Sequence, residues 1–319
     1  MTTSMSIFTI TIVGPNEAFT NQLYANGNQQ VTVTVNVTKT VDGVATPLSQ
    51  SEMNSVTVAE YSSNVWQSMP TGWSCDTSQN QYDQGLRGGT SFAARQSDSK
   101  NDATNVIYRY LRANNGVPPL QNYQFMARIT LDNGTTYTTH YDTGDVAFES
   151  KITISPQRPY VINVSELAFS REDAYHSEYS KGNAIDVDTY YWTLPSSLRV
   201  MSDYFEGQGY STSKLVYAYA INNDGNTFLG MAIHNYVTSL TLGDIGNLPN
   251  DSYYGTTVPL INSDRMMRGA RYLCNDHNCS PTYDNYLYWS ITDNLGCVSR
   301  FILKSNSGDH GNTMELSNA

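Results

Sequence analysis

The stretch RYLCNDHNCS, residues 271–280, holds two of the four cysteines of this chain. Cys274, His277 and Cys279 lie close together there, with Asp276 between them. Thiolates and imidazoles at short spacing can bind zinc, but structural zinc sites usually combine a C-x2-C or H-x3–5-H pair with a second pair elsewhere. This stretch has neither that spacing nor a marked second pair, so we expect no metal site.

A disulfide or inert thiols explain the stretch better than zinc does. A bond between Cys274 and Cys279 would staple a loop, and Cys297 would then pair with Cys75 or remain a buried thiol. Four cysteines allow three pairings, and the spacing does not choose among them. A reactive nucleophile ranks below both, because only His277 is close enough in sequence to stabilise a thiolate.

Paired carboxylates suggest a second kind of chemistry. Asp186 and Asp188 would share one face of a strand, where they could bind calcium or act as a glycosidase pair. A turn in which these side chains bond their own backbone is the simpler interpretation. The chain also lacks a G-x-S-x-G motif and a phosphate-binding glycine motif. We therefore expect no catalytic residues and no cofactor.

The remaining signal is aromatic. The chain has 24 tyrosines, 9 phenylalanines and 4 tryptophans, many of them in the C-terminal half in runs such as DTYYWTL and DNYLYW. Tyr and Trp combine apolar area with a polar tip, which suits protein interfaces and stacking on sugars. The alternative is that these rings fill a core. The candidate binding residues are Tyr190, Tyr191, Trp192, Tyr253, Tyr254, Tyr286, Tyr288 and Trp289.

Two-residue alternation predicts the elements that must carry these residues. SIFTITIVG (6–14) alternates as a first strand should, and 31–38 places four valines on one face and Thr or Asn on the other. We expect the Thr/Asn face to be open to solvent. Asn133-Gly134 lies between two alternating runs and predicts a hairpin with a type I′ turn.

These patterns predict an all-β protein of two antiparallel β-sandwich units, Ig-like or jelly-roll-like. The prolines of SPQRPY (155–160) break strand pairing, so we expect units at 1–155 and 161–319. One short helix is predicted over 171–181, because Ser170 and Asp173 resemble a capping box. Residues 241–269 are predicted to be a surface loop.

Charge and hydropathy exclude some partners. The net charge is −11 and no basic stripe is present, which argues against nucleic acid. The chain has no apolar run of about 18 residues, so no transmembrane segment is predicted. The N-terminus has no positively charged region like that of a signal peptide, so we expect cytoplasmic synthesis with leaderless release or extracellular action.

The function predicted from these features is that of a non-enzymatic interaction protein. It would be an adhesin, a fibre or a self-assembling component that contacts other protein chains, as a homo-oligomer or filament, or a glycan receptor, through β-edges and Tyr-rich loops. The alternative is a leaderless bacterial toxin, insecticidal or pore-forming, because 29–40 and 122–141 alternate over the length that membrane strands need. A glycosidase ranks third.

Overall fold

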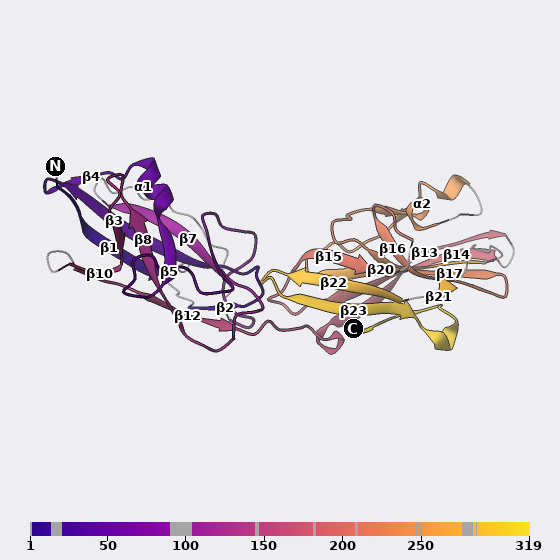
Figure 1. Ribbon diagram of the computed structural model, residues 1–319. Helices are drawn as coiled ribbons and strands as arrows, with labels where there is room; N and C mark the ends of the chain where they lie inside the picture. The colour runs from indigo at the N-terminus through magenta and orange to yellow at the C-terminus, as the bar shows by residue number, and fades with distance from the viewer. Residues whose placement is uncertain are drawn as a thin grey trace. The chain divides into compact units, whose positions relative to one another are not determined.

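The computed structural model describes residues 2–13, 21–89, 104–143, 147–180, 183–207, 210–246, 248, 251–275, 283–284 and 286–319. The chain forms two compact units: unit 1 is Met1–Pro159 with Leu295–Cys297, and unit 2 is Tyr160–Asn294 with Val298–Ala319. Both are built almost entirely of strands, which confirms the all-β prediction (Figure 1). The α-helices of the described residues are short: α1 (Gln50–Ser55) and α2 (Leu242–Ile245).

Unit 1 contains two larger sheets and a small hairpin. The first sheet has the order β1 (Thr3–Ile12), β3 (Val31–Val41), β7 (Asn105–Ala113), β6 (Trp73–Asp76), with β4 (Val44–Thr46) on β3. The second has the order β2 (Gln22–Tyr24), β12 (Ile152–Gln157), β8 (Tyr123–Thr130), β5 (Thr57–Glu60), with β9 (Thr136–Thr138) on β8. The hairpin is β10 (His140–Asp142) with β11 (Ala147–Glu149). The named strand pairs are antiparallel, except that β2 and β12 run parallel.

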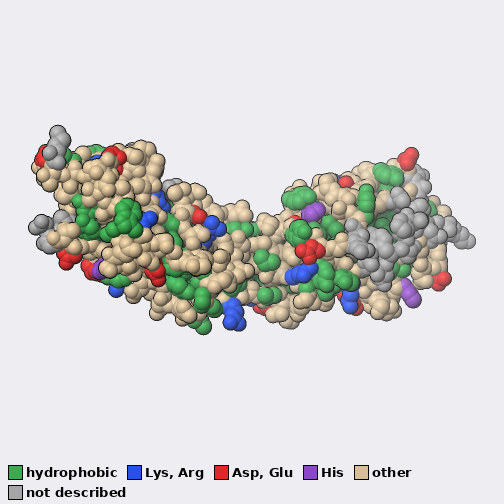
Figure 2. Space-filling view, viewed as in Figure 1, with side chains coloured by type: hydrophobic (Ala, Val, Ile, Leu, Met, Phe, Trp, Pro, Cys, Tyr) green, Lys and Arg blue, Asp and Glu red, His purple; other side chains and the backbone are tan. Residues whose placement is uncertain are grey.

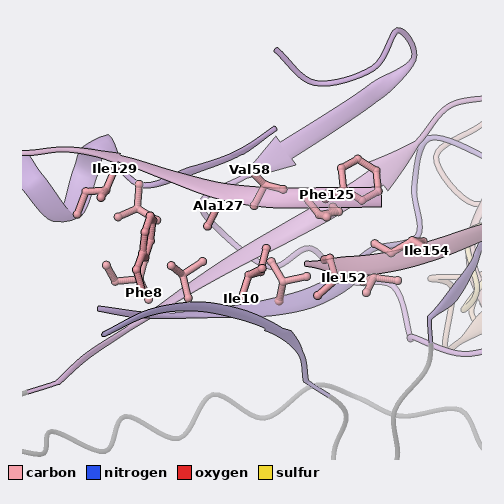
Figure 3. Close-up of a cluster of buried hydrophobic side chains, with 14 of the residues drawn as sticks. Phe8, Ile10, Val58, Phe125, Ala127, Ile129, Ile152 and Ile154 are labelled. Carbon is pink, nitrogen blue, oxygen red and sulfur yellow. The ribbon is translucent and has the colours of Figure 1, made fainter. Parts of the chain in front are cut away.

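The apolar faces of the two sheets form the core of unit 1. Figure 3 shows Phe8 and Ile10 from one sheet among Phe125, Ile129 and Ile154 from the other. Four of the valines of β3 are fully buried in the same cluster, as the alternation predicts: Val31, Val33, Val35 and Val37. Burial of this apolar surface is the main source of stability for such a unit.

The expectation of a solvent-exposed Thr/Asn face on β3 is wrong. Thr32, Thr34 and Thr38 are buried as well. Residues between β6 and β7 contact this face: Gln84 donates a hydrogen bond to the Thr32 hydroxyl, and the Thr38 hydroxyl lies 2.9 Å from that of Thr104. These hydrogen bonds make burial of the Thr32 and Thr38 hydroxyls tolerable, whereas the buried Thr34 hydroxyl has no partner among the described residues.

The hairpin predicted at Asn133-Gly134 is confirmed, but its turn type is not. Strands β8 and β9 pair with Thr130 opposite Thr136, and only Gly134 of the two turn residues has a positive φ, at 85°. The type I′ geometry, with both residues left-handed, occurs instead at Asp42-Gly43 and Asp224-Gly225.

Unit 2 contains a large sheet and a smaller one. The six-stranded sheet has the order β13 (Ala168–Ser180), β14 (Asn183–Thr193), β20 (Met266–Asn275), β17 (Asn226–Ile233), β16 (Leu215–Asn223), β21 (Tyr283–Asp284). The four-stranded sheet has the order β15 (Val200–Glu206), β22 (Tyr286–Asp293), β23 (Val298–Ser305), β24 (Met314–Asn318). A two-stranded pair, β18 (Leu240–Thr241) and β19 (Thr257–Val258), flanks α2 in sequence, and short 3-10 helices are η2 (Val164–Glu166), η3 (Asp251–Tyr253) and η4 (Ser307–Asp309).

The helix predicted over 171–181 is wrong, because its described residues, 171–180, belong to β13. Arg171 lies opposite Tyr190 on β14, and its guanidinium contacts the Asp188 carboxylate at 2.6 Å. His176 lies opposite Asp186 at 3.4 Å. These cross-strand contacts outweigh a local capping signal, which carries only a weak preference.

The inner strands β14 and β17 of the six-stranded sheet of unit 2 are buried on both faces, whereas the edge strand β13 is largely exposed. On one face Trp192 meets Trp289 of the four-stranded sheet edge-on, with ring centroids 6.1 Å apart. On the other face the core cluster includes Leu242, Ile245 and Val258, which come from α2 and β19. The prediction of a surface loop over 241–269 is therefore wrong in part: α2 and β19 pack on the sheet and the last residues begin β20, whereas the irregular residues 259–265 are exposed or half-buried.

Candidate functional site

Half of the predicted binding aromatics lie in the core. The side chains that cannot reach a ligand at the surface are Tyr190, Tyr191, Trp192 and Trp289, at 1%, 0%, 4% and 1% exposure. The run DTYYWTL carries rings on both sides of its strand because β14 is covered on both faces. Tyr286 and Tyr254 are exposed, whereas Tyr253 and Tyr288 are half-buried. Ligand binding by these four tyrosines remains a prediction.

The carboxylates suggested for a glycosidase are bound by arginines. Asp186 and Asp188 do share a face of β14, and the buried Arg271 contacts both carboxylates. Arg171 also contacts Asp188. Buried charges are tolerated when they are paired in this way, so the arrangement is typical of a structural ion-pair cluster.

The structure separates two of the alternatives for the cysteines. Cys75, Cys274 and Cys297 are not linked to one another, so of the two alternatives for Cys297, pairing with Cys75 or remaining a buried thiol, the structure has the second. Burial raises the pKa of the Cys75 thiol, which keeps it protonated and unreactive near neutral pH. Cys279 and His277 lie outside the described residues, so the Cys274–Cys279 staple remains a prediction.

Exposed aromatic rings gather on the outer face of the four-stranded sheet in unit 2. Strand β22 alternates, so Leu287 and Trp289 point inward while Tyr286 and Tyr288 point outward. In the register of β15 with β22, Glu206 lies opposite Tyr288 and Tyr204 lies opposite Ser290, which places both on the same outer face. We define the tyrosine face as Tyr204, Glu206, Tyr286, Tyr288 and Arg300. Figure 2 shows hydrophobic side chains beside single charges on the visible surface of this unit.

A stacked arginine holds the centre of the tyrosine face in place. The Arg300 guanidinium carbon lies 3.9 Å from the centre of the Tyr288 ring, and its nitrogen pairs with the Glu206 carboxylate on the far side of β22. Tyr286 meets Tyr288 edge-on at 5.2 Å. An exposed ion pair adds little to stability. Its main consequence here is a fixed orientation of the Tyr288 ring.

A cavity of about 320 Å³ adjoins Tyr204. Its lining also includes Asp203 and Phe205 of β15, Val216 of β16, and His234 at the end of β17. Because alternate residues of a strand point to opposite faces, Asp203 and Phe205 point inward beside the outward Tyr204. The lining is mixed: Phe205, Val216 and Leu287 are apolar, whereas Asp203, Ser211, Thr212 and His234 offer hydrogen-bonding groups.

Asp203 and two rings orient His234 in this cavity. The Asp203 carboxylate is 4% exposed and accepts hydrogen bonds from the Asn235 amide at 2.8 Å and from His234 Nδ1 at 3.4 Å. Phe205 meets the imidazole edge-on, and Tyr236 stacks on it with centroids 4.9 Å apart. With Nδ1 turned to Asp203, Nε2 is the nitrogen left to bond a guest.

A buried arginine fixes the backbone of the same turn. Arg268 donates to the carbonyls of His234 and Asn235 at 3.2 and 2.9 Å, and to the Asn262 side chain at 2.7 Å. Burial lowers the pKa of Arg268, but a guanidinium stays charged in a protein. The turn is thus held from one side by Asp203 and from the other by Arg268.

The sequence interpretation missed most of this site. It selected Tyr286 and Tyr288 but not Asp203, Tyr204, His234 or Tyr236. The alternation of VMSDYFE (200–206) could have indicated an outward Tyr204. Among the described residues, no group of three or more His, Cys, Asp or Glu could hold a metal ion. No helix in the described part of the chain has the length and hydrophobicity of a membrane span.

No family model and no curated protein matches the chain. Among solved structures it is similar to the C-terminal domain of the Streptococcus pyogenes antigen I/II-family protein AspA, with 10% identity, 98% of this chain and 99% of that chain covered, and a TM-score of 0.25. It is also similar to the collagen binding domain of Erysipelothrix rhusiopathiae surface protein RspB (11% identity, 98% and 94% covered, TM-score 0.19). A third similar structure is the CupB6 tip adhesin from Pseudomonas aeruginosa (6% identity, 94% of this chain and 97% of that chain covered, TM-score 0.18). TM-scores of this size carry no argument about fold or function.

Proposed function

We propose that the protein is a non-enzymatic interaction protein that binds a neutral glycan, as an adhesin does, through the tyrosine face and the adjoining Asp203–His234 cavity of unit 2. The observation that carries the proposal is the surface Tyr288 ring, fixed by Arg300 between the exposed Tyr204 and Tyr286, beside a cavity with an oriented imidazole.

Sugar rings suit this surface for two reasons. Their C–H faces stack on aromatic rings, and their hydroxyls need a few well-placed donors and acceptors. A ring that is already held in place loses little conformational entropy on binding, so Tyr288 is a favourable contact. Asp203 and His234 supply polar groups in the adjoining cavity, which Tyr204 of the tyrosine face also lines.

Charge favours a neutral ligand over an acidic one. The arginine of the tyrosine face is paired, Arg300 with Glu206, and so is Lys304, which lies opposite Tyr286 on β23 and pairs with Glu315. The chain as a whole carries a net charge of −11, which repels polyanions over long distances. A glycan rich in sulfate or uronate would have to break these pairs and overcome that repulsion.

The predicted contact through β-edges receives less support. Strand β13 lies at an edge of the six-stranded sheet, with register irregularities at Asp173/Tyr175 and Glu178/Ser180. Bulges and edge charges such as Glu172 are devices that prevent strand addition. Membrane insertion by 29–40 would require β3 to leave the core, so we do not propose the toxin function.

The experiment is a glycan array probed with the wild-type protein and with Tyr204→Ala and Tyr288→Ala. Loss of one stacking ring, worth about 1.4 kcal/mol, should weaken binding of a neutral glycan about ten-fold. Tyr254→Ala is the matched control, because Tyr254 is exposed in the same unit but outside the site. Absence of any bound glycan, or an equal loss in the control, would contradict the proposal.

A further inference from the structure

A second, differently charged groove lies on unit 1. It has a volume of about 400 Å³ and is lined by the β10–β11 hairpin and by Ser63 and Val65 of the loop after β5. The described lining residues include two carboxylates, Asp142 and Glu149, and no lysine or arginine. The nearby Lys151 ammonium lies 4.6 Å from the centre of the Tyr61 ring, and its charge also lowers the pKa of Glu149. Tyr141 and Phe148 supply its apolar part and also pack against the core.

The Glu149 carboxylate in this groove is oriented and ionised. It accepts hydrogen bonds from the Tyr61 hydroxyl and from His140 Nδ1, both at 2.6 Å. The bond from Tyr61, followed by that from His140, lowers the pKa of Glu149, so the group is an anion at neutral pH. A carboxylate has about four lone-pair positions, so acceptor capacity remains for a guest. Its side chain is 61% exposed.

An exposed tryptophan lies on the same loop as Val65. Trp66 is 65% exposed, although its loop is anchored: the Trp66 amide donates to the Asn64 side chain, and Arg128 donates to the Gln67 carbonyl. The Arg128 guanidinium carbon lies 5.9 Å from the Trp66 ring centre. A large ring kept in water on a fixed loop is the kind of residue that dominates binding interfaces.

We infer that this groove binds a basic peptide segment of a partner protein, with an arginine or lysine at Glu149 and Asp142 and an apolar neighbour against Trp66. Charge complementarity selects this occupant, because the lining offers carboxylates and the net charge of −11 attracts cations from a distance. The inference concerns unit 1 alone and does not depend on glycan binding by unit 2.

Tryptophan fluorescence provides the test. Trp73, Trp192 and Trp289 are buried, so acrylamide quenching of the 319-residue chain reports chiefly on Trp66. The probes are a capped decapeptide of alternating Arg and Val and the same peptide with Glu in place of Arg. We expect the Arg peptide to shield Trp66 and the Glu peptide to have no effect.

Two glutamate variants distinguish this groove from general electrostatic attraction. Glu149→Gln keeps the shape of the side chain and can keep one of the two bonds from Tyr61 and His140, because the amide has a single acceptor oxygen, and it removes the anion. It should weaken binding of the Arg peptide about ten-fold. Glu315→Gln, at an exposed glutamate of unit 2, should leave the affinity for the Arg peptide unchanged. Calorimetry confirms each affinity independently of fluorescence. No binding of the Arg peptide, or equal weakening by the two variants, would overturn the inference.

Discussion

Replacement of Asp203 by asparagine tests how the cavity of unit 2 orients His234. The carboxylate accepts from the Asn235 amide and from His234 Nδ1. In Asp203→Asn the side-chain oxygen can keep the bond from Asn235, but the NH2 group then faces Nδ1 and donates to it. The ring proton consequently moves to Nε2, which changes from an acceptor to a donor toward a guest.

The expected magnitudes follow from these two bonds. A hydrogen bond to a charged group contributes about 1.5–3 kcal/mol and a neutral one about 0.5–1.5 kcal/mol. Removing the buried charge also removes its desolvation cost, so we expect the free energy of unfolding to fall by only about 1 kcal/mol. Loss of one acceptor should weaken glycan binding about three- to ten-fold.

Nitrogen-15 NMR of the histidine rings measures the tautomer directly, urea titration measures stability, and calorimetry measures glycan affinity. The wild type should show the Nδ1–H form of His234, and Asp203→Asn the Nε2–H form. Asp264→Asn, at an exposed aspartate, should change none of the three readouts. A wild-type Nε2–H form, or a variant with unchanged tautomer and affinity, would refute the reasoning.

Two further predictions concern stability. A Cβ at Gly230 would lie 2.1 Å from the buried ring of Tyr219. Gly230→Ala should therefore lower the free energy of unfolding, measured by urea titration, by about 3 kcal/mol. Gly255→Ala is the control: a Cβ there has no atom within 4 Å, so the free energy of unfolding should change little. Burial raises the pKa of Asp76, but hydrogen bonds from Arg112 and Gln30 outweigh the effect of burial, so the pKa of Asp76 lies below its usual range. A carboxyl with a depressed folded-state pKa stabilises above its unfolded-state pKa and loses that contribution as pH falls through the folded-state value. Asp76→Asn should therefore flatten the acid limb of a plot of unfolding free energy against pH; an unchanged limb would contradict this.

Two-residue alternation predicted the strands well where the residues on a single face determine the pattern. The valines of β3 and the outward Tyr286 and Tyr288 of β22 lie where two-residue periodicity places them. The pattern could not show that other segments cover the second face, which is why Thr32 and Tyr191 are buried. Whether the second face of a strand is covered depends on segments distant in the sequence and leaves no signal in the strand itself.

The candidate site shows the same limit. Asp203 and His234 are 31 residues apart and meet only because β15 and β17 belong to sheets that pack together. The predicted helix at 171–181 failed for a related reason: Ser170 and Asp173 resemble a cap locally, but pairing with β14 supplies the backbone hydrogen bonds. Residues adjacent in sequence indicate an element, whereas a site depends on which elements meet.

Ring resonances of carbon-13-labelled tyrosines test glycan binding by unit 2 most directly. Assigned by single Tyr→Phe variants, they would be followed during titration with the strongest neutral glycan from the array. We expect the ring resonances of Tyr204, Tyr286 and Tyr288 to shift and those of Tyr254 and the buried Tyr190 to stay unchanged. Shifts confined to other tyrosines, or none at saturating glycan, would contradict it.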